Sequence, residues 1–215
     1  MRPKDAATVI LVRDRTHVLV GARSAGHAFM PNRYVFPGGG VDANDWRIPA
    51  ASELHPYTAS RLQQDCAPPR ARALGIAAIR ETYEETGLRL ATTSRSAERL
   101  TGDLWRSFRM AGVAPSLNAL HYFARAITPP GRPRRFDARF FLVDAAETEG
   151  ELVSNGELLD LKWVTFKQLE DLPLPDITKK IVETAQLCLN DGLEAVLASK
   201  PTFWPKGARF DPEML

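Results

Sequence analysis

Residues 80–88 (RETYEETGL) bring three carboxylates and an arginine into one short segment that is predicted to be helical. Because each residue of a helix advances by about 100°, Glu81 and Glu85 stack on one face and Glu84 flanks them. Like charges at these spacings repel, and a hard divalent cation removes the repulsion because Mg²⁺ and Mn²⁺ prefer oxygen ligands. The opposite face is largely apolar and fits a core, and Gly87 is expected to end the helix. The alternative is a solvated acidic helix end without a ligand.

This segment resembles the second half of the Nudix box, G-x5-E-x7-R-E-U-x-E-E-x-G-U, in which U is a bulky aliphatic residue. Thr82 stands at one of the U positions. Residues 36–45 (FPGGGVDAND) are similar to the lead-in and loop of the first half. The resemblance therefore covers both halves of the box.

The two halves do not have the usual spacing. Counting forward from Gly39 places Asp45 where the family has its first Glu, whereas counting back from Arg80 places Arg72 there. We interpret the box as split by an insertion of about residues 46–72, as in Nudix proteins that resemble the peroxisomal coenzyme A diphosphatases. Which residue takes the role of the first acid stays open.

The resemblance implies a Nudix fold, an α/β (α+β) architecture in which an α/β/α sandwich surrounds a mixed, partly closed sheet. It implies one domain over residues 1–215, with the insertion inside the box and a C-terminal helical extension. Nudix hydrolases cleave a nucleoside diphosphate linked to another group, with Mg²⁺ or Mn²⁺ as cofactor. By resemblance the metal ligands are the Gly38 carbonyl, Glu81, Glu84 and Glu85.

Two further residues of the box receive roles by resemblance. Arg80 is expected to pair with the carboxylates or with the glycine loop and to fix their rotamers. Gly39 is assigned to the substrate side, because a glycine lets the backbone approach a phosphate or a metal closely. Without the helix downstream, residues 38–40 would be interpreted as an ordinary turn.

The general base is a helix glutamate or a carboxylate from a later loop. Glu157 precedes Trp163 and Val164 with the spacing of the family's E-x5-W-V element, and we predict that it acts as the base or as an additional metal ligand. The alternative is an exposed acid without a role, because residues 147–160 carry several other acids.

Substrate choice depends on weaker signals. Residues 19–24 (LVGARS) and 36–39 resemble the upstream signature of coenzyme A diphosphatases, L-L-T-x-R-[SA]-x3-R-x3-G-x3-F-P-G-G. Ala28 and Asn32 stand where that signature has Arg and Gly. Arg23 keeps its place and offers a planar fork suited to phosphate.

Two stretches resemble the split-box subgroup more closely, residues 26–31 (GHAFMP) and 134–137 (RRFD). Arg134 and Arg135 are therefore candidates to bind a 3′-phosphate or a diphosphate. The alternative is a basic loop beside a strand, and the sequence favours neither.

The leading hypothesis is a metal-dependent hydrolase that cleaves coenzyme A or acyl-coenzyme A to 3′,5′-ADP and a phosphopantetheine. The runner-up hydrolyses ADP-ribose, a dinucleotide or a modified nucleoside triphosphate. A third hypothesis is a non-catalytic Nudix-fold binding module, which the intact carboxylate set disfavours.

Composition excludes several other classes. A net charge of +2 gives no reason to expect nucleic-acid or membrane binding. The two cysteines and four histidines lack metal-site spacing and no disulfide framework is implied. Charged residues near the start of the chain leave no room for a signal-peptide core, so we expect a cytoplasmic protein that acts on a small nucleotide. A homodimer stays open.

Hydrophobic periodicity and turn residues predict the main elements. Strands are predicted at Ala7–Val12, His17–Ala22, Tyr34–Phe36, Ala119–Ile127, Arg139–Val143 and Leu161–Thr165. Helices are predicted at Tyr57–Gln64, about 69–86, Phe166–Leu172 and Ile177–Leu189, with a short one within Thr93–Ser107.

Overall fold

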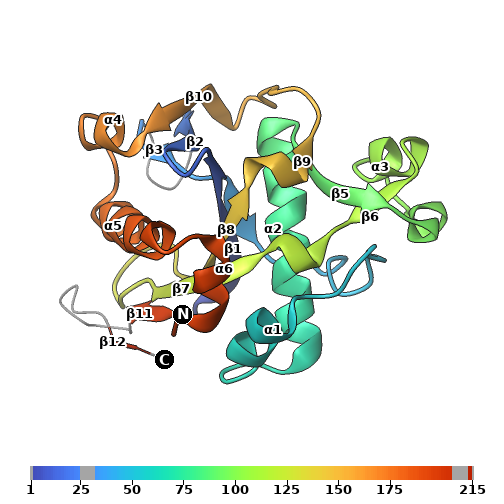
Figure 1. The fold of residues 1–215 in the computed structure, drawn as a ribbon, viewed down its shortest axis with the longest axis horizontal. Coiled ribbons are helices and arrows are strands. Elements are labelled where there is room, and N and C mark those ends of the chain that lie inside the picture. The colour runs from blue at the N-terminus through green and yellow to red at the C-terminus, as the bar shows by residue number, and fades with distance from the viewer. Residues whose placement is uncertain (1, 25–31, 205–212, 215) are drawn as a thin grey trace.

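A computed structural model describes residues 2–24, 32–204 and 213–214 of the chain (Figure 1). Its main sheet has the strand order β10-β2-β1-β8-β7-β11-β12, with β3 beside β2 and β4 beside β1. These strands are β1 (Lys4–Arg13), β2 (His17–Arg23), β3 (Tyr34–Val35), β4 (Gly38–Gly40), β7 (His121–Ile127), β8 (Phe136–Asp144), β10 (Leu158–Thr165), β11 (Thr202–Trp204) and β12 (Glu213–Met214).

The central strand β1 determines where the functional segments lie. It pairs in parallel with β8 and antiparallel with β2, which makes the sheet mixed. Along its first half β1 pairs instead with the glycine strand β4, in the register Ala7↔Gly39. The β1–β2 hairpin turns at Asp14 and Arg15, both with positive φ, and the Thr16 N–H donates to the Arg13 carbonyl at 3.1 Å. The two predicted strands, Ala7–Val12 and His17–Ala22, are thus confirmed as β1 and β2.

Helices cover both faces of the sheet. They are α1 (Pro56–Leu62), α2 (Pro68–Thr86), α3 (Arg106–Met110), α4 (Phe166–Glu170), α5 (Asp176–Asn190) and α6 (Leu193–Ala198). One core lies between the sheet and α2, and it includes Leu11, Leu74 and Phe141. A second core lies under α5 and α6, and it includes Ile10 and Ile181. The predicted α/β/α sandwich is confirmed, and in the described residues the sheet runs from β10 to β12 without closing.

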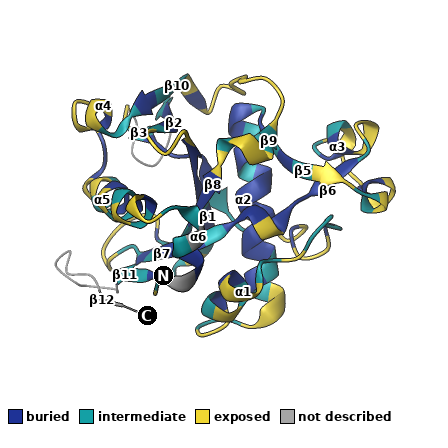
Figure 2. Cartoon of the chain, in the orientation of Figure 1, coloured by how far each residue is buried: buried dark blue, intermediate teal, exposed yellow. Residues whose placement is uncertain are grey.

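The carboxylate-bearing helix α2 is mostly buried (Figure 2). It begins at Pro68 and Pro69, which suit the first turn because proline has no N–H to leave unpaired there. It ends at Gly87, whose φ of +76° is the left-handed conformation that favours glycine. Both ends agree with the prediction to within one residue.

The split-box segment differs from its expected bounds and packs against the rest of the fold. Residues 68–72 are the first turns of α2, so the excursion from the box ends before them. The segment is also partly built into the core, since Leu62 is fully buried and the Thr58 hydroxyl donates to the Leu120 carbonyl at 2.9 Å. Its prolines exclude a long helix but leave room for the short α1.

Several short elements were not predicted from the sequence. They are the strands β4, β11 and β12, the helix α6 and the small sheet of β5 (Arg89–Thr93), β6 (Val113–Pro115) and β9 (Thr148–Glu149). The described residues also contain three 3-10 helices, at Arg95–Arg99, Leu117–Ala119 and Ala145–Glu147. Such short segments carry too few residues for a periodic pattern, and three glycines in β4 favour a turn from sequence alone.

Candidate active site

The carboxylates of α2 differ in how far they are buried. Glu85 is buried at 5% exposure, the Glu81 side chain is 14% exposed and the Glu84 side chain is 33% exposed. The buried side of the same helix carries Thr82, whose hydroxyl donates to the Ala78 carbonyl at 2.8 Å. That bond satisfies the hydroxyl inside the core, which explains how threonine replaces the expected aliphatic residue.

The glycine strand β4 lies directly against these carboxylates. The Gly38 N–H donates to Glu85 Oε2 at 2.8 Å. A Cβ on Gly39 would lie 2.5 Å from the Glu81 carboxyl carbon, and one on Gly38 would lie 2.5 Å from the Ala7 carbonyl oxygen. Gly38 is therefore required by its close approach to the β1 backbone, whereas a side chain on Gly39 would displace the Glu81 carboxylate. The structure brings residues far apart in the sequence, the glycines and the α2 carboxylates, into one site.

Arg80 connects the carboxylates to the glycine strand. Its Nη1 donates to Glu81 Oε1 at 2.8 Å and to Glu84 Oε2 at 2.7 Å, and its Nη2 donates to the Gly40 carbonyl at 2.7 Å. Its Nε donates to Asp45 Oδ1 at 2.9 Å. The guanidinium thus fixes the orientation of three carboxylates and of the Gly40 backbone that faces them.

The same contacts decide between the two positions for the first acid of the box. Asp45 is fully buried beside Arg80, within the carboxylate cluster. Arg72 instead bonds the Glu53 carboxylate and the Ile48 carbonyl, away from the site. The insertion therefore begins after Asp45, and counting forward from the glycines gives the correct residue.

Burial changes the acidity of the helix carboxylates. Desolvation raises the pKa of Glu81 to about 7, although Arg80 opposes the shift. Desolvation likewise raises the pKa of Glu85 to about 8, against the hydrogen bond from Gly38. Burial alone would lower the pKa of Arg80, but Asp45 and the two nearby glutamates raise it above its ordinary value. Protein donors therefore compensate these charges only in part.

Arg23 and Glu157 lie near the cluster from the facing strands. Leu158, next to Glu157, pairs with Arg23 where β10 meets β2. Burial lowers the pKa of Arg23, while Glu85 and Glu157 act to raise it. The Glu157 side chain is exposed, yet its charge contributes to the raised pKa of Glu85. Both residues thus lie close enough to interact electrostatically with the helix carboxylates.

The structure does not bring Arg134 and Arg135 to this cluster. The Arg135 Nε donates to the carbonyls of Thr128 and Pro129, and its own carbonyl accepts from Lys4 N–H at the start of β1. Gly38 pairs with Thr8, four residues further along β1, or roughly 13 Å at the rise of a strand. Residues 26–31 lie outside the described part of the chain.

A feature that the sequence did not reveal is the docking of the loop that leads to Glu157. The Val153 N–H donates to the Thr86 carbonyl at the end of α2, at 2.8 Å. A Cβ on Gly150 would lie 2.8 Å from the Gly87 carbonyl oxygen. This packing depends on the close contact of Gly150 with Gly87. Nothing about the positions of these two glycines in the sequence predicts that they meet.

The donor set suits a hard divalent cation. Glu81 and Glu85 offer buried carboxylate oxygens whose negative charge is costly without a cation, and the Gly38–Gly40 backbone approaches them closely. Within residues 2–24, 32–204 and 213–214, no three His, Cys, Asp or Glu side chains are arranged as a ready metal site. Glu84 is turned to Arg80, so its oxygen would have to leave that bond to join the set.

Comparison with known proteins gives the family resemblance. The chain is 28% identical over 182 residues to "Putative nudix hydrolase 7" of Caenorhabditis elegans, covering 78% of this chain and 53% of that protein. A crystal structure of a NUDIX hydrolase from Alicyclobacillus acidocaldarius superposes with a TM-score of 0.68 at 25% identity, covering 93% of this chain and 97% of the other. The chain has the fold of a Nudix hydrolase. No protein-family model matches the sequence.

A second curated relative of this Nudix-fold chain is "Acyl-coenzyme A diphosphatase NUDT19" of Xenopus laevis. It is 26% identical over 207 residues, covering 72% of this chain and 54% of that protein. The chain thus spans about half the length of the curated relatives it matches.

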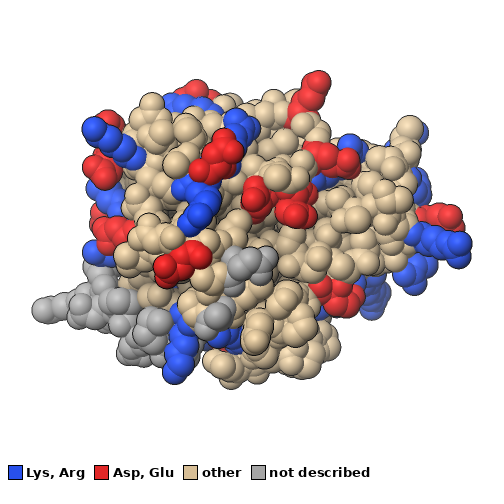
Figure 3. All heavy atoms as spheres, in the orientation of Figure 1, with Lys and Arg blue, Asp and Glu red and all other residues tan. Residues whose placement is uncertain are grey.

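On the face seen in Figure 3, acidic and basic side chains are interspersed. In the described residues no helix is both long and apolar enough to cross a membrane.

Proposed function

We propose that this chain is a metal-dependent diphosphatase that cleaves a nucleoside-diphosphate-linked substrate, with coenzyme A or acyl-coenzyme A as its first candidate. The observation that carries the proposal is the packing of Glu81 and Glu85 against the glycine strand, with Arg80 and Asp45 holding that arrangement. Two carboxylates in a desolvated site are costly to keep charged, and a bound cation offsets that cost. A binding module without metal would gain nothing from this arrangement.

In the proposed mechanism Glu81, Glu85 and the Gly38 carbonyl would hold Mg²⁺ or Mn²⁺, and Glu84 would add a ligand on leaving Arg80. When bound, the ion would supply positive charge opposite the diphosphate and a lowered pKa for bound water. Arg80 keeps the carboxylates in place through its bonds to Asp45 and the Gly40 carbonyl.

The remaining residues act on the substrate side of the site. Gly39 leaves room for the backbone to approach the diphosphate. Arg23, on β2, donates to a phosphate oxygen of the substrate where the diphosphate passes between β2 and the carboxylates. Glu157 accepts the proton of the attacking water. Water attacks one phosphorus, the bridging P–O bond breaks, and coenzyme A gives 3′,5′-ADP and a phosphopantetheine. Catalysis of this kind rests on positioning and electrostatics.

The proposal is tested by turnover of a substrate panel with Mg²⁺ and with Mn²⁺. The panel contains coenzyme A, acetyl-coenzyme A, ADP-ribose, diadenosine polyphosphates and nucleoside triphosphates. We expect hydrolysis that depends on the metal and falls by about a hundredfold or more in Glu85→Gln, because the metal loses a charged ligand. Glu170→Gln, an exposed glutamate on α4, is the matched control. A Glu85→Gln protein with near-normal rates, or the absence of any turnover, would overturn the proposal.

The coenzyme A assignment has its own arm within the panel. Coenzyme A and dephospho-coenzyme A differ only in the 3′-phosphate, so a dedicated cationic site should give dephospho-coenzyme A a higher KM. Loss of a charge-assisted hydrogen bond weakens binding by roughly tenfold or more. Arg134→Ala should remove the difference if Arg134 binds that phosphate. Equal KM values in the wild-type protein would reject such a site, and turnover of ADP-ribose alone would move the assignment to the runner-up.

A further inference from the structure

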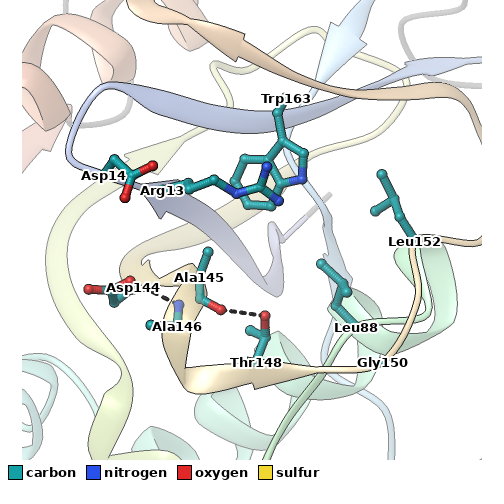
Figure 4. A pocket seen from close by; sticks show the side chains of 10 residues that line it. All are labelled: Arg13, Asp14, Leu88, Asp144, Ala145, Ala146, Thr148, Gly150, Leu152 and Trp163. Atoms are coloured by element: carbon teal, nitrogen blue, oxygen red, sulfur yellow. Dashed lines mark hydrogen bonds between the residues drawn. The ribbon is translucent and has the colours of Figure 1, made fainter.

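A hollow of about 390 Å³ lies beside the end of α2, apart from the carboxylates (Figure 4). The β1–β2 turn, the end of β8, the loop after β9 and β10 surround it. Its apolar walls are Leu88, Leu152 and Ala145, with Trp163 above them. Its volume falls within the range of small-molecule sites, and its lining combines apolar side chains with at least as much polar surface.

One wall of the hollow is a flat stacked platform. The guanidinium carbon of Arg13 lies 3.9 Å from the centroid of the Trp163 ring, and Figure 4 shows it across the face of the indole. Trp163 is half-buried and packs against the core under α2, which fixes the ring. A guanidinium held on an indole presents an extended planar surface, on which another planar ring can stack.

The opposite wall is preformed and carries hydrogen-bond acceptors. Asp144 Oδ1 accepts from the Ala146 N–H at 2.9 Å, and the Thr148 hydroxyl donates to the Ala145 carbonyl at 2.7 Å. These bonds hold the short turn after β8 in place. The exposed carboxylates of Asp14 and Asp144 stand at the rim, where their remaining oxygens can accept from a ligand's amino group.

The position of the hollow relates it to the proposed diphosphatase site. Leu88, in the wall of the hollow, follows Glu85 by three residues, just past the end of α2. Three residues of chain span at most about 11 Å. The near wall of the hollow therefore lies close to the carboxylates, whereas the Arg13–Trp163 platform lies beyond it, since Arg13 is five residues past Thr8 along β1, or roughly 16 Å at the rise of a strand. The candidate substrates coenzyme A, ADP-ribose and diadenosine compounds all contain adenine and carry a long group on each side of the diphosphate.

We propose that this hollow binds a nucleobase, stacked on the Arg13–Trp163 platform with its exocyclic amine directed to Asp14 or Asp144. The base comes either from the substrate itself, in which case the inference rests on the proposed function, or from a separate nucleotide. Stacking on an aromatic side chain tolerates any base, because every base has a flat π-face. The site therefore selects a planar heteroaromatic ring rather than one hydrogen-bonding pattern.

The direct test uses adenosine monophosphate as the probe and measures its binding to metal-free protein by calorimetry. We expect Arg13→Met and Trp163→Leu each to weaken binding about tenfold. Trp46→Leu changes another partly exposed tryptophan, in the insertion, and should bind as wild type does. Arg13 is exposed, so Arg13→Met keeps the test valid if Trp163→Leu fails to fold. No binding by the wild type, or equal binding by Arg13→Met, would overturn the proposal.

Two further measurements separate the sources of the base and separate this inference from the proposed function. Competitive inhibition by adenosine monophosphate, with a higher KM and unchanged kcat in Arg13→Met, assigns the hollow to the substrate's own base. Non-competitive behaviour with retained binding assigns it to a separate nucleotide. Glu85→Gln should abolish turnover and leave probe binding to the metal-free protein intact, so either idea can fail without the other.

Discussion

Arg80 organises the carboxylate site because one planar guanidinium reaches four acceptor groups. Its donors contact Asp45, Glu81, Glu84 and the Gly40 carbonyl, in the directions that only a fork of N–H groups provides. A lysine would carry the same charge but could not hold these groups at once. The residue therefore sets geometry, while the glutamates supply the oxygens that a cation would bind.

The raised pKa values of Glu81 and Glu85 predict how stability depends on pH in the metal-free protein. Both values, about 7 and about 8, exceed the ordinary value of 4.5. Between about pH 4.5 and about pH 8 the folded state binds more protons than the unfolded chain. These two groups therefore make the free energy of unfolding fall as the pH rises through that range. Glu85→Gln cannot titrate, and it should become progressively more stable relative to wild type across that window.

Urea denaturation at a series of pH values, with a chelator present, measures this difference. Glu170→Gln should follow the wild-type curve, because its carboxylate is exposed. A constant difference between wild type and Glu85→Gln from pH 5 to pH 8 would show that burial does not hold a proton on Glu85.

At the scale of elements, the site depends on a loop that docks on the end of α2. The Val153–Thr86 hydrogen bond and the contact between Gly150 and Gly87 bring residues 150–153 against the helix terminus. The ion pair of Arg89 with Glu149, at 3.3 Å, adds to this docking. Glu157 follows in the same loop, so the docking sets how far its carboxylate lies from the helix glutamates.

Substitution of Gly150 tests this arrangement. Gly150 has φ +111° and no room for a Cβ beside the Gly87 carbonyl, so Gly150→Ala should shift the loop and lower kcat by about tenfold or more. Gly131→Ala is the matched control, because Gly131 also has a positive φ (+85°) but nothing within 4 Å of the added methyl group. Steady-state kinetics on the best substrate of the panel and thermal denaturation measure both effects. Equal kcat values for the two variants would contradict the positioning role of the loop.

At the scale of the whole molecule, a partly buried ionic network joins the insertion to the sheet and to α2. Its members are three aspartates and three arginines: Asp5, Asp65, Asp137, Arg70, Arg125 and Arg139. Arg139 is fully buried, with Nη1 at 3.0 Å from Asp5 Oδ1 and 3.1 Å from Asp137 Oδ1. Asp65 lies at the end of the insertion and Arg70 in the first turns of α2, so the network fixes where the helix begins on the sheet.

Removal of the central arginine should destabilise the whole fold. Arg139→Met removes one of two arginine partners from each of the three aspartates, which keep Arg70 or Arg125, and the loss of hydrogen bonds between charged groups costs about 1.5–3 kcal/mol. Lys180→Met breaks the exposed pair with Glu183 and should cost less than about 1 kcal/mol. Urea denaturation compares the two variants. Similar losses of unfolding free energy would show that the network does not hold the insertion to the core.

Helical periodicity, proline and glycine predict the helix, its ends and its carboxylates, because they act through local backbone geometry. Most strands of the main sheet are also predictable from sequence, since long alternating or apolar runs carry their own signal. Features that depend only on this local pattern, such as the grouping of Glu81 and Glu85 on one helix face, therefore follow from the sequence alone. The general base, the 3′-phosphate site, the single domain, the cytoplasmic setting and the oligomeric state stay predictions.

The sequence patterns do not predict which distant residues come into contact, and these contacts are seen only in the folded structure. Asp45 rather than Arg72 lies beside Arg80, because the insertion leaves the box between these two residues. The Arg135 side chain bonds loop carbonyls near the start of β1. The three glycines of β4 form a strand that lies against Glu81 and Glu85. Such contacts depend on the register of strands and the path of loops, which no short sequence pattern encodes.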